Sequence, residues 1–190
     1  MSEKPVIFVI GGPGCGKGTQ CEKIVAKFGF THLSTGDLLR DEVKSGSERG
    51  QRLNKIMESG QLVPLEEVLG LLKDAIQKNQ SNSKGFLIDG YPRELDQAIK
   101  FQEQVCPCSL VLYFDVSDET MVKRLLKRGE TSGRVDDNEE TIRKRLDTFH
   151  KHVDPILDHC KEKLSRIAAE RGIDEIFTDV CGAISKTVVS

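Results

Sequence analysis

The sequence contains no tryptophan, few other aromatic residues and no long apolar run. No apolar stretch approaches the roughly 18–20 residues that a membrane-spanning helix needs, so we expect no transmembrane segment. The formal net charge is −2, and the chain lacks the positive excess typical of proteins that bind nucleic acid or membrane surfaces. The first ten residues, MSEKPVIFVI, show no signal-peptide pattern and have Ser rather than Gly at position 2. These absences predict a cytoplasmic protein.

The composition is that of a folded globular protein. Hydrophobic residues make up 37% of the chain and charged residues 31%, which is unlike the balance of disordered segments. A length of 190 residues suits one domain with a substantial core. We therefore expect a single domain over 1–190.

The six cysteines are expected to be reduced free thiols. Cys106 and Cys108 form the only close pair, and their spacing is too tight for the usual zinc knuckle. The other cysteines are Cys15, Cys21, Cys160 and Cys181, and none forms a ligand pattern in the sequence with His32, His150, His152 or His159. The sequence therefore predicts ordinary thiols and no metal site built from Cys and His.

Short apolar runs recur along the chain and alternate with helical patterns. Three continuous runs predict buried parallel strands: 6–10 (VIFVI), 85–89 (GFLID) and 110–114 (LVLYF). Two weaker strand candidates are 30–33 (FTHL) and 165–168 (SRIA). Because strands and helices alternate, the pattern predicts an α/β fold with a doubly wound five-stranded parallel sheet.

Apolar residues spaced three and four positions apart predict helices between these strands. Such stripes cover residues 21–28, 121–126 and 142–153. Ser117 precedes the second stripe in the position of a helix N-cap. Pro155 follows the third stripe, and we expect it to kink or interrupt that helix because proline has no backbone N–H.

Two segments lie outside the alternation of strands and helices. Residues 34–63 are polar with a helical pattern, and residues 127–137 (KRGETSGRVDD) are rich in glycine and charge. Parallel sheets of this kind bind ligands beyond the carboxyl ends of their strands. We therefore expect both segments to cover a ligand site there.

The stretch GGPGCGKGTQ at 11–20 directly follows the first predicted strand. It matches the phosphate-binding pattern G-x-x-x-x-G-K-[ST] up to Lys17, but Gly18 stands where the pattern has a hydroxyl residue and Thr19 comes one position late. A glycine-rich turn that opens a helix presents backbone N–H groups to phosphate, and a lysine adds positive charge. A plain tight turn is the alternative, but five glycines and a lysine in this context favour a phosphate site.

Four separated motifs resemble those of the nucleoside monophosphate kinases and occur in that family's order. They are GGPGCGKGTQ (11–20), STGDLLR (34–40), FLIDGYPRE (86–94) and SGRVDD (132–137). The resemblance covers nearly the whole chain and is closest to the short cytosolic adenylate kinases of the isoenzyme 1 type. In that family Gly-Lys-Gly-Thr is usual, because magnesium is held largely through water and the nucleotide. The resemblance implies P-loop kinase architecture, with 34–63 as the NMP-binding insertion and about 127–137 as a short lid.

The resemblance also implies a reaction, namely reversible transfer of the terminal phosphoryl group from MgATP to AMP to give two ADP. The partners would be the small molecules ATP, AMP and ADP, with Mg²⁺ as the cofactor. The enzyme would act as a monomer, without a second protein chain. Thr19 and Asp89 would serve the metal, mostly through water. Asp89 ends a predicted strand, where the equivalent carboxylate of many phosphoryl-transfer enzymes lies near the metal.

The same resemblance implies roles for individual residues. The ATP-binding residues would be Gly14, Cys15, Gly16, Lys17, Gly18, Thr19, Arg124, Arg128 and Arg171. The AMP-binding residues would be Thr35, Arg40, Gln61, Leu62, Val63, Gly90, Tyr91, Pro92, Arg93, Gln97, Arg134 and Arg145. The catalytic group would comprise Lys17, Arg93, Arg128, Arg134 and Arg145. Arg171 departs from the family, which has Gly at that position near the adenine of ATP.

Two other functions stay open on the sequence. A UMP/CMP kinase of the same fold is one, although such enzymes carry Ala and Asn where this chain has Thr35 and Gln97. A P-loop GTP-binding switch protein is the other. That class needs N-K-x-D after a strand, whereas the only Asn-Lys pair here, Asn54-Lys55, is followed by Met57 in a helical pattern.

Overall fold

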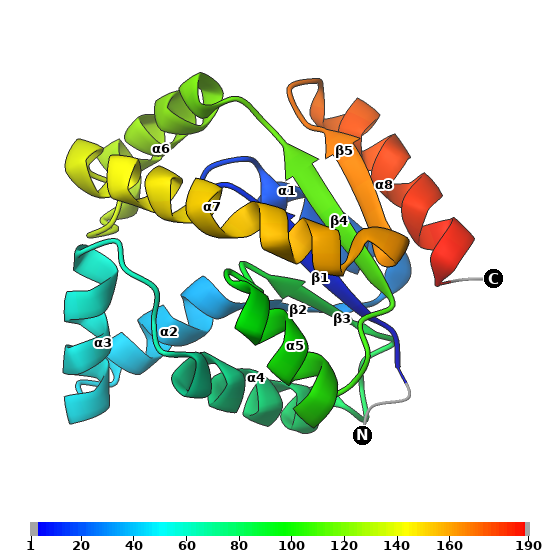
Figure 1. Cartoon of the computed structure of the whole chain (residues 1–190), viewed down its shortest axis with the longest axis horizontal. Coiled ribbons are helices and arrows are strands. Elements are labelled where there is room, and N and C mark those ends of the chain that lie inside the picture. Colours follow the sequence, from blue (N-terminus) through cyan, green and yellow to red (C-terminus); the bar gives the residue numbers. More distant parts are fainter. Residues whose placement is uncertain (1–3, 189–190) are drawn as a thin grey trace.

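The computed structural model describes residues 4–188, in which a parallel sheet lies between two layers of helices (Figure 1). Its strands are β1 (Val6–Gly11), β2 (Thr31–Ser34), β3 (Phe86–Asp89), β4 (Leu110–Asp115) and β5 (Leu164–Ala168). The order across the sheet is β2-β3-β1-β4-β5, and every pairing is parallel. This confirms the predicted fold class, and each predicted strand lies within one residue of its observed bounds.

One or more helices follow each strand. They are α1 (Lys17–Phe28), α2 (Thr35–Lys44), α3 (Glu48–Glu58), α4 (Leu65–Asn79), α5 (Leu95–Gln104), α6 (Asp118–Ser132), α7 (Glu139–His159) and α8 (Ile173–Thr187), with a 3-10 turn, η1, at Lys161–Lys163. The three predicted stripes lie in α1, α6 and α7. Ser117 caps α6 as predicted, because its hydroxyl oxygen accepts a hydrogen bond from the N–H of Thr120.

Of the two predicted effects of Pro155, a kink or an interruption of its helix, the interruption does not occur. Helix α7 continues through Pro155 to His159. A proline within a helix removes one backbone hydrogen bond, but the flanking side chains of Val153 and Ile156 are buried in the core. Their burial holds the last turn against the sheet despite the missing bond.

The core has two halves, one on each face of the sheet. Along β1, Val6 and Phe8 point to one face, where they pack with apolar residues of α4, α5 and the second half of α7. Ile7 and Val9 point to the other face, where α1, α6 and α8 cover them. All four side chains have no exposed surface, which explains why this strand reads as a continuous apolar run.

The two segments outside the alternation lie at the carboxyl ends of the strands. Residues 34–63 form α2 and α3, as their helical pattern predicted. Residues 127–137 differ from a simple loop, because 127–132 extend helix α6 and only a short turn follows before α7. In Figure 1, α2 and α3 lie on one side of this edge, with α6 and the start of α7 on the other.

Residues 34–63 contact both the second segment and the start of α7 beside it. The hydroxyl of Thr141, near the start of α7, donates a hydrogen bond of 3.1 Å to the carbonyl of Glu58 at the end of α3. A guanidinium nitrogen of Arg134 lies 4.0 Å from a carboxylate oxygen of Asp37 on α2. The site between the segments is therefore walled on both sides.

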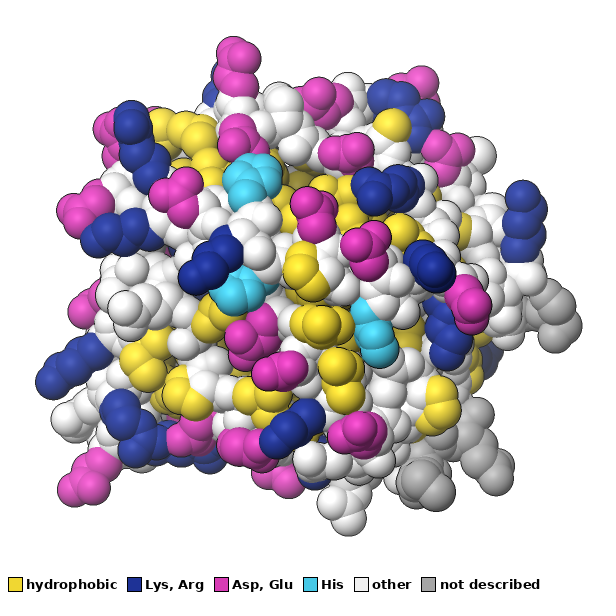
Figure 2. Space-filling view, in the orientation of Figure 1, with side chains coloured by type: hydrophobic (Ala, Val, Ile, Leu, Met, Phe, Trp, Pro, Cys, Tyr) yellow, Lys and Arg dark blue, Asp and Glu magenta, His cyan; other side chains and the backbone are white. Residues whose placement is uncertain are grey.

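Charges of both signs are interspersed over the face of the molecule shown in Figure 2, with apolar side chains scattered between them. None of the helices formed by residues 4–188 combines the length and apolar character needed to cross a membrane.

Candidate active site

A cleft of about 510 Å³ opens where the carboxyl ends of the strands meet the two covering segments. The predicted nucleotide and metal residues that line it are Gly14, Cys15, Gly16, Lys17, Gly18, Thr19, Arg40, Gln61, Leu62, Val63, Asp89, Gly90, Tyr91, Pro92, Arg93, Arg124, Arg128, Arg134 and Arg145. Three predicted residues, Thr35, Gln97 and Arg171, do not contribute to its surface. Four motifs that are far apart in the sequence therefore form one cavity.

The phosphate loop has a backbone that requires glycine at two positions. Gly14 and Gly16 have φ values of 79° and 96°, a region that side chains disfavour. A Cβ atom at Gly14 would also lie 2.7 Å from Cγ of Leu125 on α6. At Gly18 a Cβ atom would meet nothing within 4 Å, so steric crowding does not explain why a hydroxyl residue is missing there.

Helix α1 begins at the end of this loop without a side-chain cap. The first N–H groups of a helix have no partner within the helix, and together with the helix dipole they favour an anion. The ammonium of Lys17 lies over the loop, where it donates to the carbonyls of Gly11 and Gly12 at 2.8 and 2.9 Å. Its positive charge is therefore held next to the uncapped helix end.

Asp89 lies at the end of β3, beside the phosphate loop. The imidazole Nε2 of His32 is 3.1 Å from its carboxylate oxygen. Burial by itself would raise the pKa of Asp89, but the hydrogen bond from His32 and the charge of Lys17 outweigh it and lower the pKa. Asp89 is therefore a carboxylate at neutral pH.

Three carboxylates arrange the arginines of the cleft, and the sequence analysis did not select any of them. Asp137 accepts two hydrogen bonds from Arg128, at 2.6 and 2.7 Å, and one from Arg145 at 3.1 Å. Asp136 also pairs with Arg145, at 3.1 Å. Asp37 accepts a bond of 2.5 Å from Arg40. All three lie inside motifs that resemble the kinase family, so the motif positions could have indicated them.

The arginines that remain lack full compensation by acidic groups. The pKa of Arg93 is lowered, first because surrounding protein atoms remove water from its guanidinium and then because Arg145 repels it. The pKa of Arg134 is lowered in the same way, with repulsion from Arg40 and Arg128 as the next causes. Mutual repulsion among cations indicates a positive potential that an anionic ligand would relieve.

Thr35 and Gln97 lie directly behind the cleft wall and are buried. The hydroxyl of Thr35 lies 3.1 and 3.0 Å from the carbonyl oxygens of Asp89 and Gly90, and it can donate a hydrogen bond to either of them. The carboxamide oxygen of Gln97 accepts a bond of 2.9 Å from the backbone N–H of Arg93. Both side chains therefore contact the strand end that lines the cleft, although they do not line it themselves.

Arg171 lies apart from the cleft, in the loop after β5. Its Nε donates to the carbonyl of Ala168 at 3.0 Å, and its terminal nitrogen pairs with Asp179 on α8. These local partners hold the guanidinium at the surface of the molecule. The structure does not bring this predicted ATP-binding side chain together with the others.

All six cysteines are free thiols, as predicted. The sequence shows no ligand pattern between the cysteines and histidines, but the fold brings one cysteine and one histidine together. Cys21, His32 and Asp89 place one potential ligand atom each within 4.8 Å of one another. The sequence does not reveal this cluster, because α1, β2 and β3 meet only in the folded protein.

The strand order and the uncapped loop-to-helix site define the chain as a P-loop nucleotide-binding protein. The family model described as adenylate kinase matches residues 9–165. The chain is 60% identical to adenylate kinase isoenzyme 1 of Gallus gallus over 188 residues, which cover 98% of this chain and 97% of that protein. It is 57% identical to the Homo sapiens isoenzyme 1 and 58% identical to adenylate kinase 1 of Schistosoma mansoni, with 95% and 98% of this chain covered and 94% and 95% of theirs. The chain belongs to the adenylate kinase family.

Proposed function

We propose that the cleft catalyses the adenylate kinase reaction, in which the terminal phosphoryl group of ATP passes to AMP and two ADP form. One observation carries the assignment of this reaction to the cleft. The cationic side chains that line it number seven: Lys17, Arg40, Arg93, Arg124, Arg128, Arg134 and Arg145. Phosphoryl transfer depends mainly on positioning and on neutralising charge, and this arrangement supplies both.

The donor nucleotide would bind at the phosphate loop. The backbone N–H groups at the start of α1 would face the triphosphate, and Lys17 would contribute a positive charge. Arg124 reaches the loop from α6, where it donates to the carbonyl of Cys15 at 3.3 Å. Arg128 lies one turn further along the same face of α6, so it would address the same ligand.

The oxygen atoms at the floor of the cleft fit magnesium. Mg²⁺ prefers oxygen ligands and usually keeps several waters. The ionised carboxylate of Asp89 and the hydroxyl of Thr19 both line the cleft beside Lys17. We infer that these two residues hold the ion, mostly through water. When bound, the ion would neutralise charge on the phosphates of ATP.

The acceptor AMP would bind on the opposite side of the cleft. Arg40 on α2 and Arg93 after β3 present guanidinium groups there, and these would hold the acceptor phosphate. Residues 61–63 form the neighbouring wall. Thr35 and Gln97 lie behind this wall, where a small displacement would bring Gln97 against the base.

The transfer itself needs no general base from the protein. The attacking group is a phosphate oxygen of AMP, which is already ionised at neutral pH. Arg134 and Arg145 enter the cleft from the turn and the helix that follow α6, so they would neutralise charge between the two nucleotides. We propose that residues 34–63 and 127–137 act as the NMP-binding segment and the lid, which exclude water that would otherwise hydrolyse ATP.

The test is direct measurement of ADP formed from MgATP with AMP, CMP, UMP or GMP at equal low concentrations. We expect AMP to be used best and ADP to be negligible without an acceptor. Comparable or faster use of UMP or CMP would instead identify a pyrimidine nucleotide kinase. ATP hydrolysis that is independent of every acceptor would contradict a kinase altogether.

The proposal includes a monomeric, cytoplasmic enzyme. The residues assigned above to the two nucleotides line one cleft, which supports a site that would need no second chain. Light scattering during size-exclusion chromatography is expected to give the mass of one chain. Fractionation of the source cells is expected to place the protein with cytoplasmic markers.

A further inference from the structure

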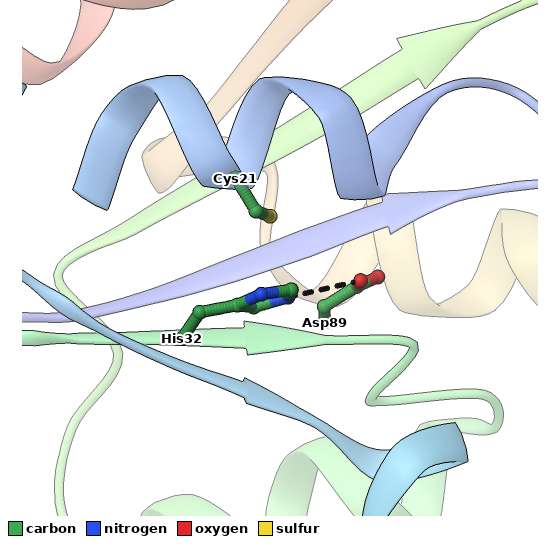
Figure 3. A group of neighbouring side chains, drawn as sticks. All are labelled: Cys21, His32 and Asp89. Carbon is green, nitrogen blue, oxygen red and sulfur yellow. Dashed lines mark hydrogen bonds and ion pairs between the residues drawn. The ribbon is translucent and has the colours of Figure 1, made fainter. Parts of the chain in front are cut away.

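Three potential metal ligands from α1, β2 and β3 lie close together (Figure 3). Cys21 projects from α1, His32 from β2 and Asp89 from the end of β3, and their ligand atoms all lie within 4.8 Å of one another. His32 and Asp89 already point at each other, with Nε2 and Oδ2 3.1 Å apart. Within residues 4–188 the thiol of Cys21 accepts and donates no hydrogen bond, although its side chain is fully buried.

We propose that Cys21, His32 and Asp89 form a site for a borderline-soft divalent cation such as Zn²⁺, and that occupation of this site inhibits the kinase. A thiolate, an imidazole and a carboxylate are the ligand types that zinc prefers. Donor atoms around a tetrahedral zinc ion lie about 3.5 Å apart, given bond lengths of about 2.0–2.3 Å. The cluster therefore needs to contract by about 1 Å at its widest, which side-chain rotation can supply.

Charge balance favours this cation in a buried position. Burial raises the pKa of the Cys21 thiol, so the cation itself must displace this proton; the resulting thiolate and the Asp89 carboxylate contribute two negative charges, and an imidazole ligand adds none. The complex with Zn²⁺ is then neutral, which limits the cost of burial. Mg²⁺ prefers hard oxygen ligands and binds thiolate poorly, so the cluster is expected to bind Zn²⁺ in preference to Mg²⁺.

The position of the cluster explains how occupation would inhibit. His32 and Asp89 both line the nucleotide cleft, so the fourth coordination position opens toward it. A cation held by Cys21 withdraws Asp89 from the oxygen ligands available to MgATP. This second step rests on the role proposed above for Asp89, whereas binding of the cation does not.

Binding is tested by titrating the reduced, nucleotide-free protein with Co²⁺, which replaces zinc and reports its ligands by absorption. We expect tetrahedral bands in the visible and a thiolate-to-cobalt band in the near ultraviolet, both removed by Zn²⁺. The variants Cys21→Ser and His32→Gln should each lose at least nine-tenths of the thiolate-to-cobalt absorption or bind Co²⁺ at least tenfold more weakly. Cys181→Ser, which changes a partly exposed thiol elsewhere, should bind as the unchanged protein does.

Two results overturn the site. One is the absence of a thiolate band in the unchanged protein. The other is a band that Cys15→Ser removes and Cys21→Ser does not, which would place the cation in the phosphate loop. Thermal melts show whether Cys21→Ser is folded, and Cys21→Ala replaces it if it is not.

Inhibition is tested by direct measurement of ADP at buffered free Zn²⁺ with magnesium in excess. We expect Cys21→Ser to need at least tenfold more free Zn²⁺ than the unchanged protein for half inhibition, and Cys181→Ser to need the same amount. Equal sensitivity of all three would attribute the inhibition to zinc bound by ATP and overturn the inhibitory role. If the unchanged protein makes no ADP at all, the proposed function fails, while the cobalt titration still decides the metal site.

Discussion

The backbone N–H of Arg93 donates a hydrogen bond of 2.9 Å to the carboxamide oxygen of Gln97. This bond fixes which way the buried amide points. The oxygen retains a second lone pair, and the nitrogen has no partner among the described residues. An amide in this orientation can accept from N6–H of adenine and donate to N1. Guanine presents the reverse pattern, so it would require the amide to flip and place its NH₂ group against the N–H of Arg93.

We therefore expect AMP to be preferred over GMP, as well as over CMP and UMP. Loss of one buried hydrogen bond costs about 1–3 kcal/mol, which corresponds to roughly 5-fold to 150-fold in kcat/KM. Gln97→Glu should lower the use of AMP by at least tenfold and raise the ratio of GMP to AMP use, because a carboxylate only accepts. Gln104→Glu, on the exposed end of the same helix, is the matched control. An unchanged ratio in Gln97→Glu would show that Gln97 does not read the base.

Lys17→Met should keep the fold and remove most activity. Methionine matches the length of the lysine stem but has no charge to place beside the transferred phosphoryl group. Contacts of this kind are worth about 2.7–4 kcal/mol, so kcat should fall at least about a hundredfold. Lys27→Met, at the other end of α1, should retain full activity. Near-normal turnover by a folded Lys17→Met protein would refute the role of Lys17.

Arg134→Lys is expected to lower kcat with little change in thermal stability. The guanidinium can bond two phosphate oxygens at once, which an ammonium cannot. Arg134 lies in a turn and makes only a distant ion pair with Asp37, at 4.0 Å, so folding gains little from it. Arg143→Lys, on the exposed face of α7, serves as the control. If Arg134→Lys and Arg143→Lys have the same kinetics, Arg134 is only a surface charge with no role in the transfer.

Asp137→Asn should destabilise the protein and change its response to acid. Burial alone would raise the pKa of Asp137, but bonds from Arg128 and Arg145 lower it below its ordinary value. A lowered folded-state pKa stabilises the fold above the unfolded pKa of about 3.9, and this stabilisation is lost as the pH falls through the folded-state pKa. The variant should lose about 1–3 kcal/mol of unfolding free energy at pH 7.

The loss caused by Asp137→Asn should shrink as the pH falls below about 4, because the unfolded chain then begins to bind a proton at Asp137, and it should vanish below the lowered folded-state pKa, where the folded carboxylate is protonated as well. Denaturant unfolding of both proteins at several pH values measures this. Glu140→Gln removes a carboxylate whose pair with Lys144 is exposed, so it should show no such difference. A loss for Asp137→Asn that is the same at pH 3 and pH 7 would mean that its charge does not stabilise the fold.

The sequence alone determined the sheet and the phosphate loop. Strand β1 is buried on both faces, so its residues form an unbroken apolar run that marks it clearly. The loop is equally local, since its glycines and Lys17 act within ten consecutive residues. Motif resemblance supplied the arginines, because their chemical role is tied to their place in a motif rather than to any local pattern.

Only the tertiary structure decided which side chains contact one another. Helix α7 continues through Pro155 because buried neighbours compensate for one missing bond. Arg128 and Arg145 share Asp137 although they lie on different helices. Cys21, His32 and Asp89 meet because α1, β2 and β3 lie side by side in the sheet layers. Such contacts depend on how elements far apart in sequence pack together, and no local spacing of residues records that.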